Sequence, residues 1–468
     1  MTNQETHATP AAPNPPHPQR WRLLGLLGAA QLMLIVDVTV VAIALPHIDT
    51  ELGLSREALT WTVSAYTLAF GGLMLLGGRI ADLAGAKRVV LAGLLLFTAA
   101  SLATGLADST GMLLGGRIAQ GVGAALMSPA ALSLVVTLFD GPERHKALGV
   151  WSALGGGGAA LGLLLGGLLT AGPGWSWVFY INVPIGAVLA VALAVMLPRP
   201  VPAAARARLD VLGALLVTAS SAVLIYALIG AGDRGWFTVA TGGLVLAALV
   251  GYGLFALWQR TAKSPLMDLA LLVRRPVATG TFLILMATAL MIAGFFLGTF
   301  YFQHTLEYGA LRTGLLFLPV AVATMLGANA TGRLLAKTGG RPLAVTGLLV
   351  AAAGLTVPAL WTHPAAVTAG VAVAGAGTGA LFVVASATAL GQVAPHEAGV
   401  ASGIVSTFHE FGASIGAAVV SSVAAASIVG DTLDGFTDGF AVAAVAAAVG
   451  AVVAGLLTPP RARAADAH

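Results

Sequence analysis

The sequence predicts an all-α polytopic membrane protein, and its composition is the first reason. Of its 468 residues, 58% are hydrophobic and only 9% are charged, whereas soluble domains carry about 25% charged residues. No soluble core could use so many apolar side chains. The 60 glycines suit transmembrane helices that pack closely, because small residues let backbones approach. The absence of cysteine excludes disulfides and thiolate metal sites.

Long hydrophobic segments are the second reason. At about 1.5 Å per residue, a helix of roughly 20 apolar residues crosses a hydrocarbon core of about 30 Å. We expect fourteen such spans, which follow a disordered tail at residues 1–19 and precede a C-terminal tail at residues 461–468. They lie near residues 23–46, 58–78, 89–107, 111–137, 147–170, 177–197, 210–230, 237–258, 277–301, 313–334, 342–361, 365–391, 400–427 and 439–458.

The basic residues give the orientation of these spans. With both termini in the cytoplasm, 19 of the 23 Lys and Arg residues fall in inside segments and three fall in outside loops. Such an excess on one side is the positive-inside signal of a multi-pass protein in the cell membrane. It also accounts for the net charge of +4 without a nucleic-acid partner.

An internal repeat divides the chain. Shifting the sequence by 254 positions places residues 78–87 over 332–341 and residues 147–152 over 401–406, with glycines and small residues in register. Both copies start on the same side of the membrane, which is typical of a parallel repeat. Spans seven and eight have no counterpart, so we expect an inserted hairpin that flanks two six-helix bundles. The predicted units are residues 20–198, 199–262 and 263–460.

Asp37 is a carboxylate inside the first span. Insertion of such a group costs about 2.5–3.5 kcal/mol, so it usually faces a polar cavity or a partner. It lies roughly ten residues, about 15 Å, before the expected outer end at Pro46 and His47. That is too deep for the alternative, an Asp that caps a helix end. We expect Asp37 to be a functional residue.

Arg117 lies at a similar depth in the fourth span, with Gln120 one turn away on the same face. An unpaired guanidinium there is as costly as the lone carboxylate, so we expect Arg117 and Asp37 to share one polar pocket. The alternative is an arginine that reaches backbone carbonyls or the interface by snorkelling.

Glu410 is the second intramembrane acid, and it lies near the middle of the thirteenth span beside His409. Burial raises the pKa of a carboxyl group and a neighbouring cation lowers it, so Glu410 is a candidate proton or substrate site. His409 is a candidate accessory titrating group. Adjacent helical residues point about 100° apart, so the two need not face one cavity.

Several motifs resemble those of one family, the major facilitator superfamily, in its fourteen-helix drug:proton antiporter branch. The resemblance covers about residues 20–458. Its motifs are the first-helix signature at 37–46, the loop at 78–88, Arg117 to Gly123 in the fourth helix, Gly162 to Gly167 in the fifth, and residues 175–184, 265–269 and 314–319. Ala42 stands where this branch usually has Asn, and Leu163 stands where it has Pro.

The resemblance implies roles for these motifs. It gives Arg117 a part in proton relay, and it gives the loop after the second helix the role of a cytoplasmic latch, formed by Gly78, Asp82, Gly85, Lys87 and Arg88. For Lys87 alone we prefer the alternative of a basic residue that sets topology, and for Asp82, an acid in a basic loop, we prefer the latch. The fifth-helix antiporter glycines are Gly158, Gly162, Gly166 and Gly167, a face on which one helix slides or bends against another.

Aromatic side chains are candidate linings of an apolar drug pocket. Each one alone could equally face lipid or pack in a core. The six candidates are Trp61, Tyr66, Trp151, Phe295, Phe296 and Phe408.

The sequence therefore predicts a proton-coupled exporter of amphipathic small molecules, with two bundles that rock around a midplane cavity. The alternative on the same fold is an exporter of one metabolite, such as a self-made antibiotic, an amino acid or a lipid. A membrane scaffold gains nothing from the insertion cost of buried acids. We expect a monomer that is not an enzyme, holds no metal or cofactor, and has substrate, protons and lipid as its partners.

Fourteen spans with both ends inside make a prediction about topology. A reporter fused after Arg461 is expected to be cytoplasmic, and one inserted at Asp233 is expected to be external, as activity of phosphatase and fluorescent fusions would show. An external reporter after Arg461 contradicts the span count.

Overall fold

The computed structural model describes residues 19–197, 209–391, 393, 398–429 and 432–458. The two expected tails, residues 1–19 and 461–468, lie outside this part of the chain except for Gln19.

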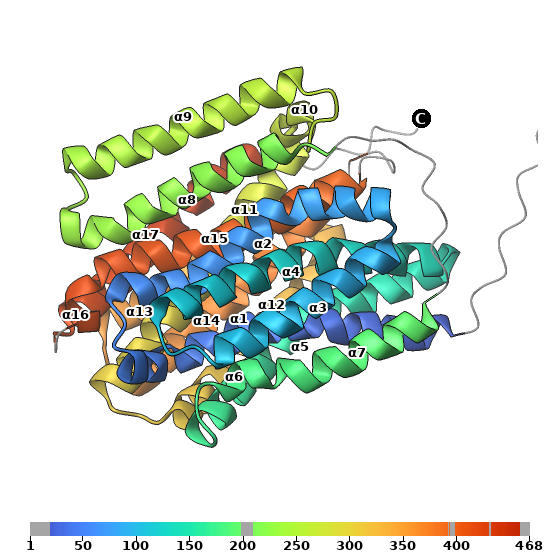
Figure 1. The fold of residues 1–468 in the computed structure, drawn as a ribbon. Helices are drawn as coiled ribbons and strands as arrows, with labels where there is room; N and C mark the ends of the chain where they lie inside the picture. Colours follow the sequence, from blue (N-terminus) through green and yellow to red (C-terminus); the bar gives the residue numbers. More distant parts are fainter. Residues whose placement is uncertain (1–18, 198–208, 392, 394–397, 430–431, 459–468) are drawn as a thin grey trace, which may run out of the picture.

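The described residues form long helices that run side by side (Figure 1). Their bounds are α1 Arg20–Leu52, α2 Arg56–Ala84, α3 Ala86–Gly105, α4 Thr110–Leu138, α5 Gly141–Ala171, α6 Trp177–Tyr180, α7 Asn182–Met196, α8 Val211–Arg234, α9 Val239–Thr261, α10 Leu269–Val273, α11 Arg275–Phe300, the π-helical turn η1 Tyr301–Thr305, α12 Ala310–Thr338, α13 Gly340–Leu360, α14 Pro364–Leu390, α15 Ala398–Val423, α16 Ala425–Val429 and α17 Asp434–Leu457.

Thirteen helical segments among the described residues are long and apolar enough to cross a membrane. The remaining predicted span, 147–170, lies within α5, whose outer part Leu161–Ala171 is a shorter apolar helix by the same criterion. The predicted all-α, many-span fold class is confirmed.

The first helix is longer than the sequence predicts. We expected its outer end at Pro46 and His47, but α1 continues through Pro46 to Leu52 and ends at Gly53, which has a φ of 60°. Proline is tolerated inside transmembrane helices because neighbouring elements satisfy the freed carbonyl. Asp37 therefore lies fifteen residues before the helix end, or about 22 Å.

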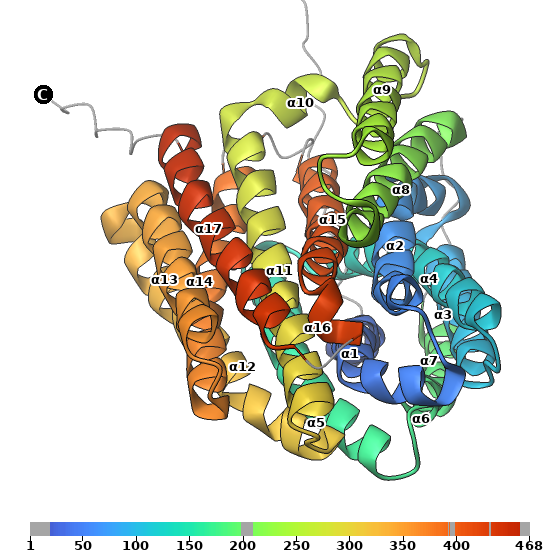
Figure 2. The same ribbon diagram turned by 90° about the vertical axis from the view of Figure 1, so that its left-hand side faces the viewer.

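The helix bounds show the internal repeat. α2 and α12 are separated by 254 positions at both ends, and α3 and α13 begin 254 positions apart. The packing repeats as well, because α2 and α3 lie against α4 while α12 and α13 lie against α14. Figure 2 looks along the helices from the end at which α6 and α16 lie, with the first half in blue and green and the second in yellow to red. By the predicted orientation this end is external, and it is called so below.

The two halves meet along two helix pairs, α2 with α15 and α5 with α12. Near the external end of α5, a Cβ at Gly314 would lie 2.6 Å from the Leu163 carbonyl oxygen, so only glycine allows this approach. Gln303 of η1 donates to the Ile43 carbonyl of α1 at 2.9 Å, which is a further contact between the halves. The halves are thus in close contact at their external ends.

The inserted helices α8 and α9 form a hairpin on one side of the molecule. α8 packs against both α2 and α15, and α9 lies on the far side of α8 (Figures 1 and 2). Asp210 caps α8 and accepts hydrogen bonds from Trp258 and Gln259 at 2.7 and 2.6 Å, which ties the two helices together. Burial raises the pKa of Asp210, but the hydrogen bonds from Trp258, Gly213 and Gln259 outweigh it and hold that pKa below its ordinary value.

Candidate coupling site and second intramembrane acid

Asp37 on α1 and Arg117 on α4 form a fully buried ion pair. Arg117 Nη1 lies 2.5 Å from Asp37 Oδ2, and neither side chain is exposed. Removing one partner of a buried pair typically costs about 3–5 kcal/mol, because the other charge stays in a low-dielectric interior. The pair is therefore a strong constraint on how α1 and α4 lie together.

The second carboxylate oxygen of Asp37 is also occupied. Oδ1 accepts from Gln120 Nε2 and from Asn182 Nδ2, each at 3.1 Å. Both amides also donate to Ser101 Oγ, at 2.8 and 3.4 Å. These hydrogen bonds join α1, α3, α4 and α7 at one point.

Arg117 has further partners on α2. Its Nε donates to the Thr62 carbonyl at 2.9 Å, and its guanidinium carbon lies 4.4 Å from the centre of the Tyr66 ring. Such a cation–π contact contributes about 2 kcal/mol or more when it is desolvated. Within the described part of the chain, Arg117 Nη2 and the Tyr66 hydroxyl are buried without a hydrogen-bond partner. Arg117 can thus keep contacts with α2 and α4 when its bond to Asp37 is broken.

Glu410 lies in a different environment, where α15 meets α2. Its Cβ packs so closely on Gly71 that a Cβ added there would lie 2.7 Å away. The carboxylate lies 3.2 Å from His409 Nδ1, with side-chain exposures of 9% for Glu410 and 38% for His409. The His409 ring is 5.9 Å from the ring of Phe382 on α14. Glu410 is thus at the surface between the halves, whereas Asp37 lies inside one of them.

The loop between α2 and α3 has its own contacts. Gly85 has a φ of 91°, which favours glycine. Lys87 Nζ donates to the carbonyls of Ala194 and Leu197 at the end of α7, at 2.8 and 2.6 Å. Asp82 lies 4.0 Å from Arg79 on its own helix, with both side chains exposed.

The other two latch residues lie close by. Gly78 faces Pro129 of α4, and Arg88 is exposed at the start of α3. The described contacts of Asp82 are within its own helix in this state, so the latch stays a prediction.

The fifth-helix glycines face two helices. A Cβ at Gly158, Gly162 or Gly166 would lie within 3.1 Å of α1 atoms, and one at Gly167 would lie 3.0 Å from Ala310 and Leu311 of α12. Leu163, which stands in place of the family's proline, is fully buried and directs its carbonyl toward Gly314. The glycine face therefore sits where α1 and the second half both approach α5.

The structure does not bring the six candidate aromatics together. Tyr66 packs under Arg117 and contacts Phe70 and Phe97 inside the first half. Trp151 packs against the first-half core, and Phe295 and Phe296 contact Phe317 and Phe300. Trp61 and Phe408 both lie near Phe411 of α15.

Sequence reasoning missed several contacts of this site. Asn182 stands in the segment at 175–184, and a polar residue at the start of an apolar span was the available signal. Ser101 gave no sequence signal, because serines that face neighbouring helices are frequent. The Thr62 carbonyl gave none either, because a backbone oxygen has no sequence signature. Phe382 beside His409 was not among the candidate aromatics.

Comparisons with known proteins agree with the predicted family. Residues 27–417 match the family model described as Major Facilitator Superfamily. The puromycin resistance protein of Streptomyces alboniger is 40% identical over 419 residues, which cover 86% of this chain and 82% of that protein. The probable actinorhodin transporter of Streptomyces coelicolor is 33% identical, with 86% and 72% covered. The multidrug resistance protein Stp of Mycobacterium tuberculosis is also 33% identical, with 85% and 74% covered.

Solved structures show the same fold at low sequence identity. A bacterial homologue of the human lysosomal transporter Spinster, in an inward-facing conformation, aligns with a TM-score of 0.63 and 16% identity, covering 94% of this chain and 96% of that one. A peptide transporter of the POT family aligns with a TM-score of 0.64 and 18% identity, covering 96% and 98%. The chain therefore belongs to the Major Facilitator Superfamily and is a multi-pass membrane protein.

Proposed function

We propose that the protein exports amphipathic small molecules across the cell membrane in exchange for protons, by alternating access of its two halves. Family membership and relatives named for antibiotic resistance and export support the transport of such compounds. Both termini are cytoplasmic in this proposal, and a monomer that needs no cofactor carries out the exchange. The observation that carries proton coupling is the fully buried ion pair of Asp37 and Arg117.

Asp37 is the proton-carrying group in this proposal, because its charge state decides what Arg117 binds. A proton on Asp37 removes the negative charge that compensates Arg117. Arg117 then keeps the Thr62 carbonyl, Gln120 Oε1 and the Tyr66 ring as partners, all on α2 and α4. Protonation thereby weakens the hold of α1 on α2 and α4. Protonation of Asp37 thus changes how α1 packs against α2 and α4.

Glu410 is the substrate-facing acid. It lies between the halves beside the more exposed His409, and in this proposal a molecule bound at the midplane contacts it. A carboxylate there attracts cationic amphipathic compounds, and Phe382 offers an aromatic face nearby. In this proposal Asp37 couples proton movement to transport, and Glu410 selects substrates by their charge.

Export of a single antibiotic is the second candidate. Two of the relatives compared are named for puromycin and actinorhodin, each a single compound. Growth inhibition by a panel of dyes, quaternary ammonium compounds and antibiotics distinguishes the two candidate functions, when cells that express the protein are compared with cells that do not. Protection against several unrelated compounds supports the broad exporter, and protection against one supports the specific exporter.

The ion pair predicts a non-additive effect on stability. Arg117→Gln leaves Asp37 buried and uncompensated, so it is expected to destabilise the fold by about 3–5 kcal/mol. Asp37→Asn combined with Arg117→Gln removes both charges and is expected to recover much of that loss. Thermal unfolding midpoints of the purified proteins in detergent measure this. A double variant as unstable as the sum of the single ones contradicts a direct pair.

The two acids predict different transport defects. Asp37→Asn keeps the shape but removes the titrating group, so gradient-driven efflux of every substrate is expected to stop while binding persists. Glu410→Gln is expected to weaken the binding of cationic substrates by about 1–3 kcal/mol, the range for loss of a charge-assisted partner. The binding of neutral substrates should be nearly unaffected. Efflux of one cationic and one neutral compound at two pH values measures both, and full proton-dependent transport by both variants defeats the proposal.

A further inference from the structure

Arg56 is a buried cation at the external end of the interface between the halves. It is the first residue of α2, and its side chain is only 4% exposed. A guanidinium removed from water needs partners for its charge and its donors. All of its partners come from other elements.

These partners lie on two elements, α8 and α15, that are far from Arg56 in the sequence. Arg56 forms an ion pair with Asp233 and donates to the Ile229 carbonyl at 3.0 Å, both on α8. Its other nitrogen donates to the carbonyl and the hydroxyl of Ser421 on α15, at 3.3 and 3.2 Å. One side chain therefore joins the first half, the second half and the inserted hairpin.

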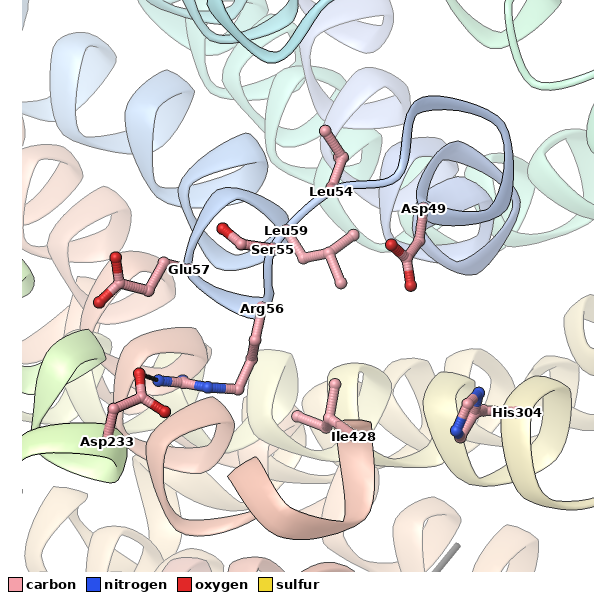
Figure 3. Close-up of a pocket in the computed structure, with 9 residues that line it drawn as sticks. All are labelled: Asp49, Leu54, Ser55, Arg56, Glu57, Leu59, Asp233, His304 and Ile428. Carbon is pink, nitrogen blue, oxygen red and sulfur yellow. Dashed lines mark hydrogen bonds and ion pairs between the residues drawn. The ribbon is translucent and has the colours of Figure 1, made fainter. Parts of the chain in front are cut away.

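The junction forms part of the wall of a cavity of about 520 Å³ at the external face. Figure 3 shows Arg56 and Asp233 joined on one side of this cavity, with Asp49 and His304 on the other. Glu57 lines the same cavity, but among the residues drawn no hydrogen bond or ion pair joins it to Arg56. The cavity lies where an external opening between the halves would form.

Below Arg56 the interface is held by hydroxyl groups. Thr60 and Ser421 are 2.5 Å apart, and so are Thr67 and Ser414. Each threonine also bonds a carbonyl of its own helix, such as Thr60 to Arg56 at 3.1 Å. The two threonine hydroxyls keep these carbonyl partners when α2 and α15 part, so only the serine hydroxyls of α15 lose their hydrogen bonds there.

Arg56 differs from the threonine hydroxyls. When α2 separates from α15, Arg56 loses its bonds to Ser421, and the space around its guanidinium opens. α8 is close to α15 here, since a Cβ at Gly232 would lie 2.5 Å from the Ser422 carbonyl oxygen. The hairpin thus contacts both helices that must separate.

We propose that Arg56 and Asp233 are positioning residues of the transport cycle, through which the inserted hairpin holds α2 and α15 together and keeps the external side shut. The ion pair lets α8 contribute to the closed state without lining the path. Asp233 sets how readily the external side opens. This inference rests on alternating access, and its test needs neither a substrate nor a proton gradient.

The cysteine-free chain allows a direct test. Ser64 is fully buried beside α15, and its carbonyl accepts from Ser414, so Ser64→Cys reports external opening at that depth. The measurement is the rate of labelling by a membrane-impermeant maleimide in right-side-out vesicles. Asp233→Asn in this background is expected to label about five-fold faster, the equivalent of about 1 kcal/mol for a partly exposed ion pair.

Two matched variants control for charge. Asp233→Glu keeps the carboxylate, and Glu57→Gln removes a charge from the same cavity; both are expected to label like the Ser64→Cys parent. Unfolding midpoints are expected to fall by no more than the equivalent of this roughly 1 kcal/mol, because Asp233 is half exposed. An unchanged rate in Asp233→Asn, an equal increase in Glu57→Gln, or a faster rate with a loss of stability well beyond that amount overturns the proposal. Each of these leaves the efflux results for Asp37 and Glu410 standing.

Discussion

The buried ion pair of Asp37 and Arg117 is the contact around which the first half is arranged. It forms where α1 and α4 meet, and Ser101, Thr62 and Asn182 add α3, α2 and α7 to the same cluster. Two charges in an apolar interior stabilise a fold only when they are paired and hydrogen-bonded. The surrounding amides and the Tyr66 ring meet that condition, so the positions of the helices and the charge state of Asp37 are linked.

The two halves have the same helix packing but differ in their charged residues. The repeat places Met291, Val371 and Ala374 where the first half has Asp37, Arg117 and Gln120, so the second half has no equivalent ion pair at these positions. Conversely, Glu410 corresponds to Gly156 of the first half. The shared small residues and glycines keep the helix packing alike in both halves. The charged residues differ, which places one acid inside a half and the other between the halves.

Sequence reasoning could predict the fold because apolar length, basic loops and the repeat all follow from the membrane itself. It could also predict the depth of Asp37 and Arg117, since charges inside spans are few. Asn182 was missed although a polar residue begins that apolar span, because an uncharged amide carries no insertion cost large enough to demand a partner. Arg56 resembles an ordinary loop residue, and its burial depends on the inserted hairpin. The aromatic candidates could not be separated, because packing and pocket-lining rings have the same spacing.

The end of α1 shows the same limit at the level of one helix. Pro46 removes one backbone donor and marks a boundary in soluble proteins, but here the helix continues to Leu52. The external contacts of α1 with Gln303 and of α2 with Ser421 depend on how the helix ends are placed. Local sequence predicts where helices exist, and the three-dimensional packing decides where they end.

In the proposed mechanism Asp37 exchanges a proton as substrate binds. Proton release from the purified protein measures this exchange, in weakly buffered detergent solution with a pH indicator, as a substrate identified by the growth panel is added. We expect release that saturates with substrate for the parent and for Glu410→Gln, at a higher substrate concentration for the latter. We expect no release for Asp37→Asn, although substrate still binds. Release from Asp37→Asn equal to that of the parent would show that Asp37 does not carry the proton.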